Sequence, residues 1–194
     1  MAKGPGENTM SRPISGAMIG GGNAGQSWNS STNKNILAGE AAIKDNSSET
    51  AMVFDVSGNL ITSSKGNSHQ VSVGNVPEGS ILTHNHPGGG TLSKQDILSG
   101  TSMNLSEIRA VTSKRVYSMK RPAGGWGDRA KWIPAISRAE TRVREKLQSF
   151  VRRGQRISYF EARKRQITAN EIRQHLVWKA VSKEFGWTYR KSET

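Results

Sequence analysis

Residues 81–97, ILTHNHPGGGTLSKQDI, constrain the fold and the chemistry of this chain more than any other stretch. The whole chain has four histidines, and two of them, His84 and His86, lie in this stretch at the end of an apolar run, separated by one residue. Side chains two positions apart on a strand point to the same side, so both imidazoles can reach one ion while Asn85 faces away. The pattern therefore predicts a strand that ends in a pair of metal ligands.

The residues after the second histidine predict a sharp turn followed by a helix. Pro87 ends the strand, and glycines 88–90 allow the chain to turn back without Cβ clashes. Ser93 is then expected to begin a helix with Asp96 in its first turn, and a strand end that faces a helix start can bring this carboxylate beside the imidazoles. Two histidines and a carboxylate are a typical catalytic zinc set, with the fourth position left for water. The alternatives are a simple Ser-x-x-Asp helix cap and a His-x-His pair in an ordinary loop.

Short β-prone runs surround this stretch. The first two are expected to form a hairpin that turns at Ser57-Gly58, and the last two a hairpin that turns at Ser113-Lys114. A loop is expected over residues 121–132. The predicted strands are residues 51–56, 59–63, 70–73, 80–84, 108–112 and 115–119.

The end of the chain is expected to be helical. Three Ser/Thr-x-x-Glu patterns are typical of helix starts, and Gly154 and Gly186 are expected to stop two of the helices. The patterns are Ser137 with Glu140, Ser158 with Glu161, and Thr168 with Glu171. The apolar faces are Val143, Leu147, Phe150 and Val151 in one helix, and Ile172, Leu176 or Val177, Ala180 or Val181, and Phe185 in the last, where Trp178, Trp187 and Tyr189 also pack.

The charge is concentrated in the second half. Residues 1–112 hold 7 Lys/Arg and 8 Asp/Glu, a net charge of −1, whereas residues 113–194 hold 21 and 7, a net charge of +14. A strongly basic region attracts polyanions such as nucleic acid, an acidic protein or an anionic membrane. The alternative is a solvated basic surface without a partner. The residues expected to contact nucleic acid are Arg152, Arg153, Arg163, Lys164 and Arg165.

Composition narrows the class of protein. Cysteine is absent, which excludes a disulfide framework and a Cys-based zinc site and fits a reducing compartment. No run is long and apolar enough to span a membrane, and the N-terminus lacks the apolar segment of a signal peptide. Residues 1–35 are rich in glycine and serine, so a flexible arm is expected there.

The segment HNHPGGGTLSKQD resembles the signature of the JAMM (MPN-plus) metalloprotease family: an upstream Glu, His-x-His-Pro, a short spacer and Ser-x-x-Asp. The HNHP spelling resembles the bacterial RadC branch and JAMM-like domains of phage proteins and polymorphic toxins. The resemblance covers about residues 49–120. It implies that His84, His86 and Asp96 bind zinc, that Ser93 stabilises the oxyanion, and that the upstream Glu is the general base.

Two features of the resemblance leave alternatives open. The six-residue spacer, residues 87–92, is one residue shorter than the usual family spacer, so the glycines either absorb the difference or Ser93 and Asp96 are displaced. The general base is expected to be Glu49, since ETAMVFDVSGNLI resembles the family segment in which a Glu precedes an apolar strand. Glu40, which precedes a polar run, is the alternative.

The resulting prediction is an α+β fold. A mixed, mostly antiparallel sheet of JAMM/MPN (cytidine-deaminase-like) type is expected in residues 36–125, after the arm and before a basic helical extension in residues 126–194. The predicted function is zinc-dependent hydrolysis of peptide or isopeptide bonds. The alternative is a nucleic-acid-associated, phage or toxin structural protein that uses the core as a scaffold. The expected location is the cytoplasm, a phage virion or a delivered effector.

Overall fold

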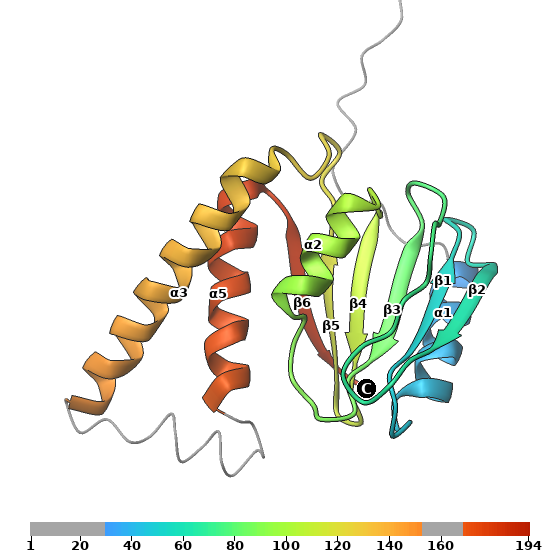
Figure 1. Ribbon diagram of the computed structural model, residues 1–194, viewed down its shortest axis with the longest axis horizontal. Helices are drawn as coiled ribbons and strands as arrows, with labels where there is room; N and C mark the ends of the chain where they lie inside the picture. Colours follow the sequence, from blue (N-terminus) through green and yellow to red (C-terminus); the bar gives the residue numbers. More distant parts are fainter. Residues whose placement is uncertain (1–29, 153–168) are drawn as a thin grey trace, which may run out of the picture.

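The computed structural model describes residues 30–152 and 169–194 and is built around one six-stranded sheet (Figure 1). The strand order is β2-β1-β3-β4-β5-β6. Four of the pairings between neighbours are antiparallel, and the central β3–β4 pairing is parallel. The predicted α+β class with a mixed, mostly antiparallel sheet is confirmed. The strands are β1 (Thr50–Phe54), β2 (Leu60–Lys65), β3 (Ile81–Asn85), β4 (Glu107–Val111), β5 (Arg115–Lys120) and β6 (Thr188–Glu193).

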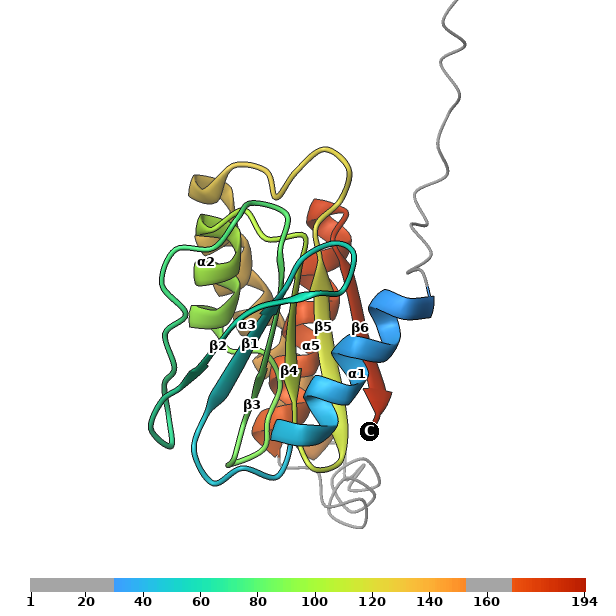
Figure 2. The same ribbon diagram turned by 90° about the vertical axis from the view of Figure 1, so that its right-hand side faces the viewer.

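Helices cover both faces of the sheet (Figure 2). Helix α1 (Ser30–Ile43) lies on one face, where Ile36 packs with Phe54 and Ile81. The larger core lies on the other face, between the sheet and the remaining helices. These helices are α2 (Lys94–Ser102), α3 (Arg129–Arg152) and α5 (Ala169–Phe185). None of the helices described in residues 30–152 and 169–194 is long and apolar enough to cross a membrane.

Both predicted hairpins are present. The β1–β2 turn is closed by Asp55, whose carboxylate accepts hydrogen bonds from the backbone N–H groups of Ser57 and Asn59. Gly58 has φ 84°, a conformation that a residue with a Cβ adopts at a cost, so glycine is the favoured residue there. Residues 112–115 close the second hairpin, between β4 and β5.

Residues 70–73 do not form the predicted strand. Val71 and Val73 are half-buried and pack on the larger core, which explains the alternation in the sequence, but the segment pairs with no strand of the described sheet. Alternation reports which side chains are buried and does not report pairing. Helix α1 was also not predicted, and it begins at Ser30, inside the region expected to be an arm.

Helix α3 begins earlier than predicted. It starts at Arg129, where the Asp128 carboxylate accepts a hydrogen bond from the Ala130 N–H, so Ser137 and Glu140 lie in the helix interior and are not a cap. The helix continues through Pro134 because its neighbours on the buried face, Trp132 among them, anchor it to the core. The predicted Ser158–Glu161 start and the Gly154 stop lie outside the described residues.

The C-terminal region is part of the core. Helix α5 begins at Ala169 and ends at Phe185, before Gly186 with φ 69°, which agrees with the predicted stop. The predicted cap residue Thr168 lies outside the described residues. Trp178 and Trp187 are buried, also as predicted, with exposed fractions of 0% and 4%. Strand β6, which was not predicted, pairs along the whole of β5 and completes the sheet. The residues expected to be a helical extension therefore contribute a strand to the sheet itself.

A buried ion cluster fixes α1 to the sheet. Arg109 of β4 donates hydrogen bonds to Glu40 of α1 at 2.6 and 3.0 Å and to Glu107 at 2.8 Å, and the three side chains are 13%, 3% and 3% exposed. Burial raises the pKa of Glu107, against the opposing effect of Arg109. Thr83 of β3 also donates a hydrogen bond to Glu40. The cluster therefore joins α1, β3 and β4 on the face of the sheet opposite to the one that carries His84.

Replacing Arg109 by Met is expected to lower the free energy of unfolding by about 3–5 kcal/mol, because two buried carboxylates lose their partner. The matched control is Arg138→Met, which removes the exposed Arg138–Glu184 pair and is expected to cost about 0.2–1 kcal/mol. Urea denaturation of both variants measures the difference. Equal losses in the two variants would show that the buried cluster does not stabilise the fold.

Candidate metal centre

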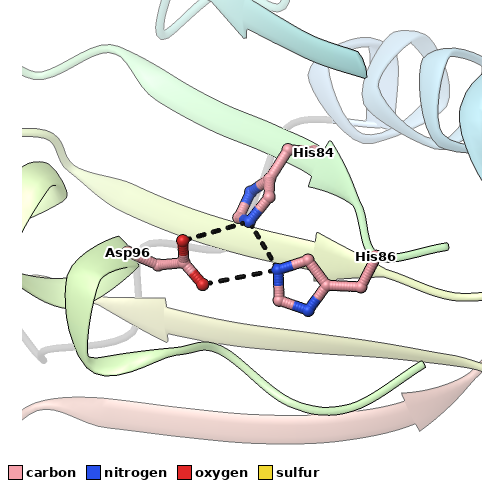
Figure 3. A group of neighbouring side chains, drawn as sticks. All are labelled: His84, His86 and Asp96. Atoms are coloured by element: carbon pink, nitrogen blue, oxygen red, sulfur yellow. Dashed lines mark hydrogen bonds and ion pairs between the residues drawn. The ribbon is translucent and has the colours of Figure 1, made fainter. Parts of the chain in front are cut away.

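Three predicted ligands converge at one end of the sheet (Figure 3). His84 comes from β3, His86 directly follows it, and Asp96 comes from the first turn of α2. The two Nε2 atoms are 2.8 Å apart, and the Asp96 carboxylate oxygens lie 3.3 Å from His84 Nε2 and 3.4 Å from His86 Nε2. One ligand atom from each residue falls within 4.8 Å of the others. Within the described residues, this is the one such group of three His, Asp or Glu side chains.

The local backbone explains why the two histidines face the same way. The His86 N–H donates to the Val111 carbonyl at 2.9 Å, which continues the parallel β3–β4 ladder one residue beyond the strand. The chain then turns at Gly89 and Gly90, which have φ 75° and 106° and suit residues without a Cβ. Asp96 reaches both histidines across the six-residue spacer of residues 87–92, so this spacer does not displace Asp96 from the cluster.

Ser93 and Asp96 form the predicted helix cap and Asp96 also joins the cluster. The Ser93 hydroxyl accepts a hydrogen bond from the Asp96 N–H at 3.0 Å, and the Asp96 carboxylate accepts one from the Ser93 N–H at 2.6 Å. The same carboxylate faces both imidazoles. The cap and the ligand interpretations are therefore compatible, because the cap orients the carboxylate toward the histidines.

Electrostatics favour a cation at this position. Burial by itself lowers the pKa of His84, but the carboxylates of Asp96 and Glu49 outweigh it, so the pKa of His84 is raised. Burial raises the pKa of Asp96, yet His84 and His86 hold the pKa of that carboxyl far below its ordinary value. A carboxylate that stays ionised beside two imidazole nitrogens attracts positive charge, either a proton or a metal ion.

The two candidate general bases lie on opposite faces of the sheet. Glu49 precedes β1, is half-buried and lines the same pocket as His84 and His86. Glu40 belongs to α1 and is held by Arg109 in the buried cluster on the other face. Of the two predicted carboxylates, Glu49 is therefore the one that shares a cavity with the histidines.

The pocket, which we call the trough, has a volume of about 890 Å³. Its lining comes from α2, from residues 68–74 and from the sheet residues Leu82 and Ile108. The histidines and Ser93 lie at the start of α2, whereas Arg129, which donates a hydrogen bond to Ser102, lies at its end. The trough thus extends along the nine residues of α2, about 13 Å.

Trp178 of α5 supports the loop of the candidate metal centre, a contact that was not predicted. Its indole N–H donates to the Leu92 carbonyl at 2.6 Å, directly before the helix cap of α2. The two residues are 86 positions apart in the chain, so no local pattern reveals the contact. The signal in the sequence was limited to a tryptophan on the packing face of a helix.

Trp178→Phe is expected to destabilise the fold by about 1–3 kcal/mol, because a buried carbonyl loses a donor, and to weaken zinc binding up to about tenfold. Trp187→Phe is the matched control, since Trp187 is also buried and donates to the Trp126 carbonyl instead. It is expected to lower stability and leave zinc affinity unchanged. Urea denaturation and a zinc titration measure both properties. Unchanged zinc affinity in Trp178→Phe would contradict the coupling.

The donor set fits a divalent metal. Two imidazole nitrogens and one carboxylate oxygen converge at the edge of a pocket, and a hydrogen bond between two Nε2 atoms requires a shared proton that a metal ion would replace. Such a set suits zinc in a site that keeps a position open. Comparison of the chain with family models, with curated proteins and with solved structures finds no match.

Proposed function

We propose that this protein is a zinc-dependent hydrolase of peptide or isopeptide bonds. The observation that carries the proposal is the convergence of His84, His86 and Asp96 in a pocket that Glu49 also lines. The order and spacing of these residues resemble the JAMM signature. The proposed fold of the sheet is accordingly that of the JAMM/MPN family. The sheet has ligands at the end of a strand and at the start of the following helix, as the resemblance requires.

The chemistry divides among the residues of the pocket. His84, His86 and Asp96 would hold the ion, and a bound zinc ion polarises a carbonyl and lowers the pKa of a water molecule to about 7. Glu49 accepts the proton of the attacking water and returns it to the leaving amine. The Ser93 hydroxyl accepts a hydrogen bond from the Asp96 N–H, so its own proton is free to be donated to the developing oxyanion.

The trough favours an extended polypeptide as substrate. Its length along α2 accommodates about four residues of extended chain at roughly 3.3 Å each. Leu98, Met103, Val71 and Val73 are among the apolar residues of its lining. A linear tail, either a peptide or the C-terminus of a protein in an isopeptide linkage, fits this shape better than a compact metabolite.

Cleavage of a proteome-derived peptide library tests the proposal. The zinc-loaded protein is expected to generate new termini that mass spectrometry detects, and a chelator is expected to abolish them. Addition of zinc after the chelator is removed should restore cleavage. Isopeptide-linked conjugates are tested in parallel, since they present an amine from a lysine side chain. No cleavage of either substrate class by the zinc-loaded protein would refute the hydrolase.

A second candidate function, binding of a polyanion, is favoured by the surface of α3. The basic residues of this helix whose side chains are described are all exposed. They are Arg129, Lys131, Arg138, Arg142, Arg144 and Lys146. Among the residues predicted to contact nucleic acid, Arg152 ends α3, and Arg153, Arg163, Lys164 and Arg165 lie outside the described part of the chain.

Salt dependence tests this second candidate. Fluorescence anisotropy with a labelled DNA duplex is expected to show binding that weakens by about 10³-fold or more between 50 and 200 mM salt, if at least six phosphates are neutralised. The cleavage experiment with the peptide library does not depend on DNA binding, so the two candidate functions are tested separately. Absence of binding at 50 mM salt would remove the second candidate.

A further inference from the structure

Asn85, the residue between the two histidines, makes contacts that the metal site does not account for. Its side chain is 0% exposed and faces away from the pocket, as strand alternation requires. The side-chain amide oxygen of Asn85, Oδ1, accepts a hydrogen bond from the Thr50 N–H at 2.6 Å. Its amide NH2 donates to the carbonyls of Asn46 and Ser48 at 3.0 and 3.2 Å. One buried amide thus binds three backbone groups of a single segment.

The bound segment is the connection between α1 and β1, which carries Glu49. The Ser48 carbonyl and the Thr50 N–H are the backbone groups on either side of Glu49, and both are held by Asn85. The Asn46 side chain adds a hydrogen bond to the Thr50 hydroxyl at 3.0 Å, which closes the turn on itself. The backbone around Glu49 is therefore tied to the strand that supplies His84.

The opposite side of Glu49 is held by the other neighbouring strand. Its N–H donates to the Asn67 carbonyl at 2.7 Å, and its carbonyl accepts from the Gly66 N–H at 2.8 Å, which extends the β1–β2 ladder. No side-chain hydrogen bond in the described part of the chain holds the Glu49 carboxylate, which lines the pocket. Its location is therefore determined through its backbone, and Asn85 supplies the contacts on the side of the histidines.

We propose that Asn85 is a positioning residue that sets the distance between the Glu49 carboxylate and the nitrogens of His84 and His86. The proposal rests on the proposed function, in which Glu49 is the general base. Asn85 touches neither substrate nor the reacting atoms, because its side chain lies on the other face of β3. We call the three hydrogen bonds of the Asn85 side chain to residues 46–50 the Asn85 clamp. Misplacement of a reacting group by about 1 Å can lower a rate by about 100-fold, so loss of this clamp should reduce kcat.

Asn85→Ser and Asn85→Asp test the clamp. Serine is too short to reach the segment, and aspartate retains the acceptor for the Thr50 N–H but loses the donor for Asn46 and Ser48. Both variants are expected to bind zinc within about threefold of the unsubstituted protein, since the ligands are unchanged, and to show a kcat about 10–100-fold lower with little change in KM. If one variant does not fold, the other is measured.

Thr83→Val is the matched control. Thr83 lies two residues earlier on the same strand and face, is also 0% exposed, and donates its hydroxyl hydrogen to Glu40, away from the Glu49 segment. Loss of this hydrogen bond in Thr83→Val should lower the free energy of unfolding without lowering kcat. Amide hydrogen exchange gives a readout independent of activity: residues 46–50 should exchange at least about tenfold faster in the Asn85 variants and unchanged in Thr83→Val.

A double-mutant cycle with Glu49→Gln decides the mechanism. If Asn85 acts through Glu49, Asn85→Ser should lower kcat by less than about threefold in the Glu49→Gln background. An equal loss in both backgrounds would overturn the positioning role and leave a general structural one. Loss of zinc in the Asn85 variants would also overturn it. Absence of hydrolysis by the unsubstituted protein would instead refute the proposed function, and that result is visible without any variant.

Discussion

Alanine at His84 or at His86 is expected to weaken zinc binding by more than about 100-fold. Each imidazole supplies one of three donor atoms that converge in the structure. Loss of an outer-shell partner already lowers metal affinity by about 10–100-fold, and loss of a ligand should exceed that. Competition with a chromophoric zinc chelator measures the affinity of each variant.

His69→Ala is the control for this first prediction. His69 lines the same pocket but is exposed and stands outside the ligand group, so its removal should leave the affinity unchanged. The result also tests specificity, because a chelator competition detects any zinc site on the surface. Equal affinities for His84→Ala and His69→Ala would mean that zinc binds elsewhere.

Glu49→Gln is expected to lower kcat by about 10²–10⁴-fold while zinc remains bound. Glutamine preserves the size of the side chain and removes the carboxylate that accepts a proton. Zinc should be retained because Glu49 is not among the three ligands. The rate of cleavage of a peptide selected from the library, together with the zinc content of the same sample, measures both properties.

Glu78→Gln is the matched control for the base. Glu78 is an exposed carboxylate that accepts a hydrogen bond from the Asn104 side chain and does not line the pocket. Its substitution should leave kcat unchanged. A Glu49→Gln variant that cleaves as fast as Glu78→Gln would exclude Glu49 as the base and would require another proton acceptor in the pocket.

The centre of the candidate site could be predicted from the sequence because its determinants are local. His84, His86 and Asp96 lie within 13 consecutive residues, and a strand, a glycine turn and a helix cap determine their relative positions. The two hairpins were predictable for the same reason, since turn residues lie between the paired strands. The choice between Glu49 and Glu40 depended on which face of the sheet each occupies, which only the fold reveals.

The missed elements lack a local signal. Strand β6 is exposed along most of its length and carries no alternation of apolar residues, so its pairing with β5 depends on the position of α5. In the part of helix α1 whose side chains are described, positions 36, 39, 40 and 43 form the buried stripe, but two of them are Gly39 and Glu40, so the sequence shows no apolar pattern at helical spacing. The supports of the site were missed because they are tertiary contacts: Trp178 reaches Leu92, and Asn85 reaches the segment around Glu49.

Anomalous diffraction at the zinc absorption edge, from crystals of protein purified without added metal, tests the central claim most directly. One peak per chain is expected, about 2.0–2.2 Å from Nε2 of His84, Nε2 of His86 and one carboxylate oxygen of Asp96. Absence of a peak at these residues, even after crystals are soaked in excess zinc, would contradict the claim. The convergence of the three side chains would then be a hydrogen-bonded cluster, and the hydrolase proposal would lose its basis.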